Sequence, residues 1–146
     1  MSQPFLIVVV RSTSDRPCRL EGYLDLVEAR RSIPGQPGDM PVAFRVHHSV
    51  YERQDAGPKP IGVSASHPAF FYVGTVLAFR GGLHAIVLNE LAFGLPGPRT
   101  VVHLPVRLAA NNRPGKPYPI GITALERCPR PTASATPELL ARACAG

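Results

Sequence analysis

Apolar and polar residues alternate along much of this chain, which is the spacing of a β-strand with one buried face. The clearest example is residues 42–50, where every second position is apolar apart from one histidine. The intervening positions carry alanine, arginine, histidine and serine. We therefore predict a half-buried strand whose inward row is Val42, Phe44, Val46, His48 and Val50.

Seven further stretches have the composition of short strands, and most end at clusters of turn-forming residues. Gly81-Gly82 and Pro96-Gly97 are predicted hairpin loops that join consecutive strands. Turn signals that recur roughly every 8–12 residues are typical of a β-sandwich. The pattern thus predicts an all-β fold, an antiparallel sandwich of seven to eight strands. The seven stretches are residues 5–11, 20–29, 61–64, 69–79, 83–93, 100–108 and 120–126.

The sandwich core is expected to be filled by alternate residues from both sheets. The residues expected to be largely buried there are Val42, Phe44, Val46, Val87, Leu91, Val102 and Leu104.

The end of the chain departs from this alternation. Residues 129–146 are rich in Pro and Ala. Thr136 is a suitable N-cap and Pro137 suits the first position of a helix, so a helix is predicted over residues 137–143. Because that helix has under two turns of good propensity, the tail is expected to be a short helix or disordered. We divide the chain into a β-sandwich domain, residues 1–128, and this tail.

The net charge and the positions of the basic residues bear on whether the partner is a nucleic acid. The chain carries 16 Lys plus Arg against 10 Asp plus Glu, a net charge of +6. The basic residues are scattered, and Arg30-Arg31 is the only adjacent pair. Since nucleic-acid-binding surfaces gather their basic residues on one face or along one helix, we expect no nucleic-acid partner.

The first apolar run, Phe5 to Val10, is too short for a membrane span or for the apolar part of a secretory signal. We therefore expect no membrane span. Localisation then depends on whether a leader upstream of Met1 was removed: the protein is exported or in the cell envelope if so, and cytoplasmic otherwise.

Motifs that carry chemistry are absent from the sequence. His47 and His48 are neighbours on a predicted strand and point to opposite faces, and no HxH, HExxH or CxxC spacing occurs. Ser64 and Ser66 lie near His67, but no GxSxG, P-loop or GxGxxG motif is present. We expect no catalytic residue, no metal site and no cofactor.

Four residues are candidates for a surface contact. Glu90 interrupts an apolar strand, and on a one-sided sheet it faces solvent. His84 and His103 lie on strands that are expected to pair, so they could approach each other across the ladder. Tyr72 belongs to an aromatic run, residues 70–72, in which one parity fills the core and the other could form an exposed patch.

Several motifs resemble one known family. Residues 16–23 (RPCRLEGY) are similar to its Cys-x-Leu-x-Gly-Tyr segment, and residues 60–65 followed by 70–73 to its Pro-Gly-x-x-Ala segment with the apolar strand behind it. Residues 91–97 and 100–105 are similar to its late hairpin. The family is the actinobacterial immunoglobulin-like domain of unknown function numbered forty-two thirty-two, found in exported proteins and lipoproteins. The resemblance covers roughly residues 5–126.

The resemblance implies an immunoglobulin-like sandwich and a place in the cell envelope, and it implies no activity. We expect a non-catalytic binding or structural module that acts through a sheet face or loops on an unknown protein or envelope component. The alternatives are an intracellular or phage-type assembly subunit and a small hydrolase or metal-dependent enzyme. Exposed edge strands would also be compatible with a homodimer.

The cysteines at positions 18, 128 and 144 are odd in number, so not all of them pair within one chain. On the family resemblance Cys18 lies near the bottom of the sandwich, whereas Cys128 ends its last strand. We expect that any disulfide joins Cys18 or Cys128 to another of the three, and the preferred pair is Cys18–Cys128, which would tie the two ends of the sandwich together. Cys144 would then be a free thiol in the tail.

Overall fold

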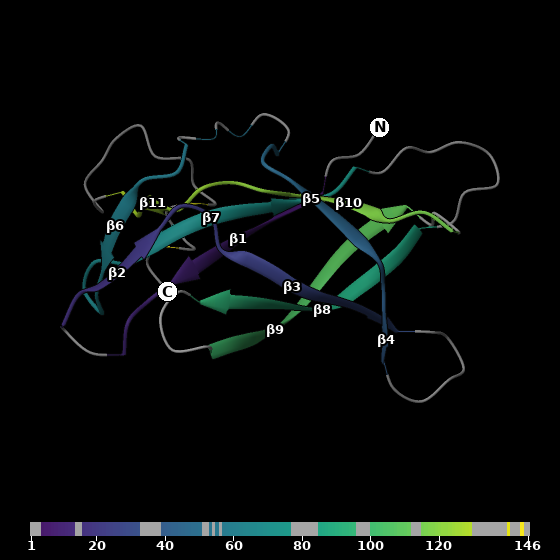
Figure 1. The fold of residues 1–146 in the computed structure, drawn as a ribbon, viewed down its shortest axis with the longest axis horizontal. Coiled ribbons are helices and arrows are strands. Elements are labelled where there is room, and N and C mark those ends of the chain that lie inside the picture. Colours follow the sequence, from purple (N-terminus) through teal and green to yellow (C-terminus); the bar gives the residue numbers. More distant parts are fainter. Residues whose placement is uncertain are drawn as a thin grey trace.

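The computed structural model describes residues 4–13, 16–32, 39–50, 53, 55, 57–76, 85–95, 100–111, 115–129, 140 and 144. Over these ranges the fold is all-β, as predicted (Figure 1). None of the described residues belongs to a helix long and apolar enough to cross a membrane. The strands are β1 (Phe5–Val10), β2 (Cys18–Glu21), β3 (Asp25–Ser32), β4 (Asp39–Pro41), β5 (Phe44–His47), β6 (Pro60–Val63), β7 (Ala69–Gly74), β8 (Ala85–Leu95), β9 (Thr100–Asn111), β10 (Tyr118–Ile122) and β11 (Glu126–Arg127).

The strands form two main sheets and a small third one. The first sheet has the order β1-β7-β10-β5, and β11 pairs with β7 beside β10. The second sheet has the order β4-β3-β8-β9, and β2 pairs with β6 alone in the third. Eleven strands are thus described instead of seven to eight, because the structure adds the short strands β4 and β11 and divides one predicted strand into β2 and β3.

The pairing is antiparallel except between β5 and β10, which run parallel. This departs from the wholly antiparallel sandwich predicted above. A glycine permits the close approach of the two segments: a Cβ at Gly121 would lie 2.0 Å from the Ser49 carbonyl oxygen, just after β5 ends. Local alternation contains no information about such a long-range parallel pair.

One apolar core joins the two main sheets. In each sheet the inward row is set by the two-residue period of the strands. Phe71 on β7 and Phe93 on β8 meet edge to face across the core, with their ring centroids 5.3 Å apart. The largest side chains that are almost wholly buried are Phe71, Leu88, Leu91, Leu108, Ile120, Ile122, Leu125, Val63 and Val73.

The predicted core is right in part. Val42, Phe44 and Val46 pack against the core with partial burial, Leu104 does the same, and Leu91 is fully buried. Val87 and Val102 were expected to be buried, but 38% and 42% of their surfaces are exposed.

Two features explain these errors. An irregularity in the β8–β9 register between Leu88 and Glu90 shifts the inward row of β8, so Leu88 and Leu91 face the core and Val87 faces outward. Val102 has the inward parity of Leu104, but it lies near the start of β9, an edge strand, so only β8 flanks it.

Only one of the two predicted hairpins forms. β8 and β9 pair antiparallel on either side of Pro96-Gly97. β7 and β8, in contrast, belong to different sheets, so the hairpin predicted at Gly81-Gly82 is wrong. The residues of both loops lie outside the described ranges. A turn signal marks where a strand ends, but it does not select the sheet of the next strand.

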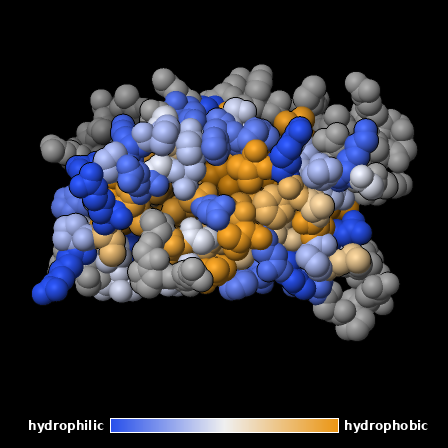
Figure 2. Space-filling model, viewed as in Figure 1, coloured by the Kyte–Doolittle hydropathy of each residue, from blue (hydrophilic) through white to orange (hydrophobic). Residues whose placement is uncertain are grey.

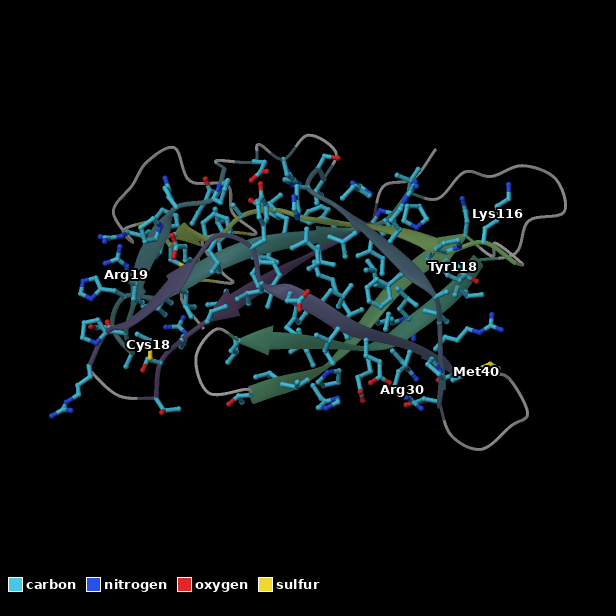
Figure 3. The ribbon with its side chains drawn as sticks, in the orientation of Figure 1. Cys18, Arg19, Arg30, Met40, Lys116 and Tyr118 are labelled. Carbon is cyan, nitrogen blue, oxygen red and sulfur yellow. A yellow bond between two sulfur atoms is a disulfide. The ribbon has the colours of Figure 1, made fainter. Side chains whose placement is uncertain are left out.

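The disulfide joins Cys128 to Cys144, with their Cα atoms 5.8 Å apart, and Cys18 is an exposed free thiol. The predicted Cys18–Cys128 pair is therefore wrong. Cys18 lies on β2 in the small third sheet, at one end of the molecule (Figure 3). Cys128 follows β11 and packs into an apolar cluster outside the main core, which also contains Leu140 and Cys144. Leu140 and Cys144 have helical backbone, and Leu140 is the one residue of the predicted 137–143 helix that lies within the described residues.

Candidate binding surface

β1 forms an edge of the first sheet and has the sequence FLIVVV. Within the described residues it pairs with β7 alone, in register from Phe5 opposite Gly74 to Val10 opposite Ala69. All six residues are only partly buried. Edge strands commonly carry a proline or a charged residue that prevents further pairing, and β1 has neither.

The direction of the free backbone groups of β1 follows from the hydrogen bonds of Tyr72 on β7. The Tyr72 amide donates to Thr123 Oγ1 at 2.8 Å, and its carbonyl accepts from the Thr123 amide at 3.0 Å. Both groups of Tyr72 thus point away from β1. Ile7, which lies opposite Tyr72, therefore belongs to a pair that exchanges no ladder hydrogen bonds.

By alternation, Phe5, Ile7 and Val9 all direct their N–H and C=O groups to the free edge. The bond from the Thr75 amide to the Pro4 carbonyl agrees, because it assigns Pro4 and the other even positions to the β7 side. The edge is thus a row of three donors and three acceptors along a strand of roughly 20 Å.

The side chains of β1 are apolar on both faces. Leu6, Val8 and Val10 pack against the main core, whereas Phe5, Ile7 and Val9 pack into the outer cluster with the C-terminal cysteines. This two-sided packing is the physical reason for the unbroken apolar run, since a strand covered on both faces has no polar row.

A groove of about 550 Å³ runs between β1 and β9, the edge strands of the two main sheets. Its walls are residues 6–9 on β1 and residues 104–107 on β9. Leu6 and Val8 from one sheet and Leu104 and Val106 from the other all pack on the core margin at this groove. The main core therefore continues outward into an apolar channel along the free edge of β1.

β9 differs from β1 in its protection. It carries Pro105, which has no amide hydrogen to donate, and, two residues further on, the exposed Arg107. Val101 and Val102, nearer the start of β9, are 46% and 42% exposed. Of the two strands at the groove, β1 is the one with an uninterrupted backbone edge.

Apolar surface also gathers on the face of the molecule that Figure 2 shows. Figure 2 shows an apolar band across the middle of one face, between polar rims, in the region where β1, β3 and β5 lie in Figure 1. Apolar surface gathered in this way is typical of interaction surfaces.

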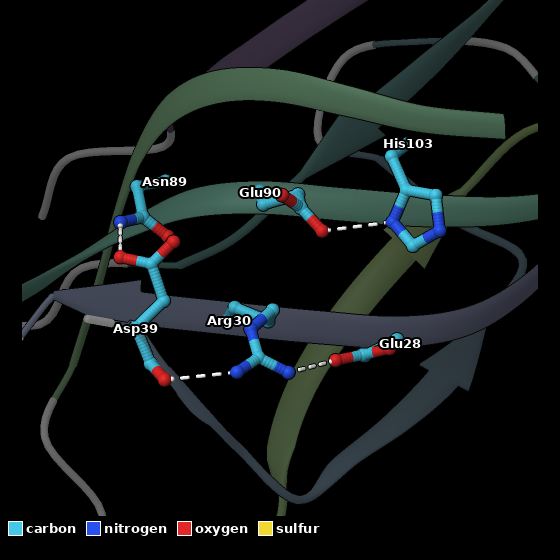
Figure 4. A network of polar contacts seen from close by, with 6 residues as sticks. All are labelled: Glu28, Arg30, Asp39, Asn89, Glu90 and His103. Carbon is cyan, nitrogen blue, oxygen red and sulfur yellow. Dashed lines mark hydrogen bonds and ion pairs between the residues drawn. The ribbon is translucent and has the colours of Figure 1, made fainter.

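The outer face of the second sheet carries a network of polar contacts, and two of the predicted contact residues meet there. His103 Nδ1 on β9 lies 2.9 Å from Glu90 Oε1 on β8 (Figure 4). On β3, Arg30 forms an ion pair with Glu28 and donates to the Asp39 carbonyl oxygen at 2.9 Å. The hydrogen bond with Glu28 raises the pKa of Arg30 most; burial opposes this rise, and the charges of Glu28, Glu90 and Asp39 add to it.

A neighbouring set of contacts ties β8 to the β3–β4 edge. The Asn89 side-chain amide donates to Ser32 Oγ at 2.6 Å and to Asp39 Oδ1 at 2.7 Å. Like the Glu90–His103 contact, these hydrogen bonds join complementary groups on adjacent strands, as cross-strand pairs in sheets commonly do. The network thus ties β3, β4, β8 and β9 together across the second sheet.

The other predicted contact residues have different outcomes. Tyr72 was a candidate for an exposed patch, but it is only 8% exposed, because its ring lies in the outer cluster beside Phe5 and Phe70. His84 lies outside the described residues, and so does its proposed approach to His103.

The serines near His67 do approach it. Ser66 Oγ lies 3.0 Å and Ser64 Oγ 3.4 Å from His67 Nδ1, and the His67 amide donates to Ser64 Oγ at 3.1 Å. These contacts span at most three residues and close the turn between β6 and β7. No described acidic residue is paired with His67, so the third member of a catalytic triad is not seen there.

Sequence reasoning missed a polar cluster around Asp55. Tyr23 donates to Asp55 Oδ2 at 2.5 Å, and the amides of Ala124 and Gly57 donate to Oδ1 at 3.0 and 3.2 Å. The His48 ring stacks on Tyr23 at 3.5 Å between centroids. These residues come from four separate parts of the chain, so no local spacing could have revealed the cluster.

No group of three metal-ligating side chains occurs among the residues that the structure places. Neither a protein-family model, nor a curated protein, nor a solved structure matches this chain. The function must therefore be inferred from the surface described above.

Proposed function

We propose that this chain is a non-catalytic protein-binding module that accepts an extended segment of its partner as an added strand on β1. The observation that carries the proposal is the free edge of β1, where Phe5, Ile7 and Val9 present three donors and three acceptors without a proline or a charge. Strand addition of this kind gains affinity from main-chain hydrogen bonds and specificity from the pockets for alternate side chains.

The groove defines the chemistry of the segment. A strand added beside β1 directs alternate side chains toward Leu104 and Val106, so those positions should be apolar. Arg107 is the charged residue of the groove and the chain carries a net charge of +6, which favours an acidic residue over a basic one near the end of the segment. The partner proposed is thus an extended polypeptide with alternating apolar residues and an acidic flank.

The disulfide supports a cell-envelope location over an intracellular one. Disulfides form and persist mainly in oxidising compartments, and Cys128 and Cys144 are joined here. An envelope module is also what the resemblance to the actinobacterial immunoglobulin-like family implies. We therefore place the module in the envelope and take the phage-type assembly subunit as the alternative.

The test is peptide binding measured by fluorescence anisotropy. Labelled eight-residue peptides with alternating Val or Ile and one terminal Glu should bind saturably. Val9→Pro removes one donor from the free edge but leaves the ladder to β7 intact, because the Val9 amide points away from β7. This variant should weaken binding at least tenfold, whereas the matched control Val9→Thr, which keeps the amide, should bind within about threefold.

Two results would contradict strand addition. One is equal binding to the Val9→Pro and Val9→Thr variants, or to a peptide whose alternate amides are N-methylated. The other is a stable dimer in analytical ultracentrifugation that Val9→Pro dissociates, which would assign the edge to a second copy of the chain.

A further inference from the structure

The C-terminal strap, defined here as Leu140 and Cys144, lies on the outer face of the first sheet. Leu140 is 7% exposed and belongs to a cluster with Val50, Phe70 and Tyr72. Cys144 packs against the same cluster. The strap thus covers aromatic side chains of β7 on the side of the sheet that faces away from the main core.

Two kinds of contact hold the strap. The covalent contact is the disulfide to Cys128, whose own amide is fixed by a 3.0 Å hydrogen bond to the Pro68 carbonyl oxygen. The non-covalent contacts are the packing of Leu140 and a 2.5 Å hydrogen bond from Arg11 Nη2 to the Cys144 carbonyl oxygen. Because the hydrogen bond is exposed to water, it contributes little by itself.

The cluster under the strap is separate from the core that joins the two sheets. Ala69, Phe71 and Val73 of β7 face that core, whereas Phe70 and Tyr72 face the strap. Arg53 also lies on this outer side, with its guanidinium carbon 4.3 Å from the Phe5 ring centroid and 5.3 Å from that of Tyr72. Loss of the strap would therefore uncover the outer cluster and leave the sandwich core in place.

We propose that the Cys128–Cys144 bond is a redox latch that holds the strap over the outer face of β1 and β7. A dithiol reductant opens it. One of its thiolates attacks a latch sulfur, the latch S–S bond breaks, and the other latch cysteine leaves as a thiolate while a mixed disulfide forms. The second thiolate of the reductant then attacks the reductant's own sulfur in the mixed disulfide and releases the remaining latch cysteine. Two electrons pass from the dithiol to the latch, the reductant becomes a disulfide, and two protons end on the Cys128 and Cys144 thiols. Both cysteines are partly exposed, so the bond is within reach of such a thiol.

The size of the effect follows from chain entropy. The bond closes a loop with a sequence separation of 16 residues. Closing a loop of about this length shifts the equilibrium between held and released ends by roughly two orders of magnitude in the chain-entropy model. Once the bond is reduced, the contacts that remain between the described residues and the strap are the packing of Leu140 and Cys144 and one exposed hydrogen bond, so the strap dissociates and uncovers Phe70 and Tyr72.

The test compares oxidised and reduced protein in a Cys18→Ser background, in which the latch cysteines are the only ones. Dithiothreitol should increase the fluorescence of an apolar surface dye severalfold. It should also increase the hydrogen exchange of the peptide around Leu140 at least tenfold. Far-UV circular dichroism and the exchange of β8 should stay unchanged. The variant Cys144→Ser should behave like the reduced protein without added dithiol.

Three results would overturn the latch. Unchanged dye binding together with unchanged exchange at Leu140 would mean that the strap stays in place without the bond. Loss of the β-sheet spectrum on reduction, or in Cys144→Ser, would mean that the bond holds the whole fold together. Equal dithiol responses in Cys144→Ser and in the parent protein would place the effect elsewhere.

Discussion

Asp55 shows how one side chain can join distant parts of this chain. Burial by itself raises the pKa of Asp55, but hydrogen bonds from Tyr23 and from the amides of Ala124 and Gly57, with the charge of His48, together lower it. The Tyr23 pKa is raised in turn, first by its hydrogen bond to this carboxylate. A carboxylate with a lowered folded pKa contributes stability that is present above its unfolded pKa and is lost as the pH falls through the folded value.

The first prediction is therefore a pH-dependent effect of Asp55→Asn. At pH 7 the variant should lose about 1–3 kcal/mol of unfolding free energy, because the hydrogen bonds to the charged carboxylate are lost or weakened. The loss should shrink as the pH falls below the ordinary aspartate value of about 3.9. Urea denaturation at several pH values measures this difference. A loss that stays constant down to pH 2 would contradict the assignment, and Asp25→Asn, at an exposed position, is the control.

The second prediction tests the register shift in β8. Leu91 is fully buried, so Leu91→Ala should cost about 2–5 kcal/mol of unfolding free energy. Val87→Ala removes apolar surface from the same strand at a position that is 38% exposed, and it should cost under about 1 kcal/mol. Chemical denaturation of both variants checks this. Similar losses would mean that the inward row continues through Val87 without the shift.

At the scale of elements, the two strands at the groove differ in how they resist pairing. β1 is uniformly apolar, whereas β9 carries Pro105 in the stretch that faces the groove. A proline on an edge strand limits pairing with further strands. The sandwich thus has one protected edge and one open edge on the same side, and this asymmetry directs an added strand to β1.

The third prediction concerns a substitution that removes the proline from the β9 edge. Pro105→Thr adds an amide donor to β9 and gives the groove a second uninterrupted edge. The variant should self-associate at concentrations where the parent protein does not, which light scattering coupled to size-exclusion chromatography measures. Pro119→Thr, on β10 between β5 and β7, is the control, because that strand has neighbours on both sides. Equal association of the two variants would mean that Pro105 does not protect the edge.

At the scale of the whole molecule, the disulfide ties residue 144 to the end of the sandwich instead of joining the two ends of the sandwich itself. The fourth prediction is that non-reduced, denatured protein titrates with one thiol, Cys18, and that peptide mapping recovers Cys128 linked to Cys144. Removing the bond should cost about 3 kcal/mol or less, the chain-entropy value for a loop of roughly this length. A mapped Cys18–Cys128 peptide would contradict the structure.

The fold could be predicted in its local features. Alternation located β5, and strand-like composition between turn residues located most of the other strands, including β1, β6 and β9, because both signals are properties of neighbouring residues. The sequence indicated Glu90 and His103 as two separate candidates for a surface contact. It could not predict that they pair with each other, since that contact depends on the β8–β9 register.

What the sequence by itself determined is the β class, the approximate positions of most strands and the apolar character of β1. Only the tertiary structure decided which strands lie at the edges, that β7 and β8 enter different sheets, and that Cys128 pairs with Cys144. The physical reason is that strand pairing is a contact between distant segments. Its hydrogen bonds are made by backbone groups that every residue other than proline shares, so they leave little trace in the local pattern.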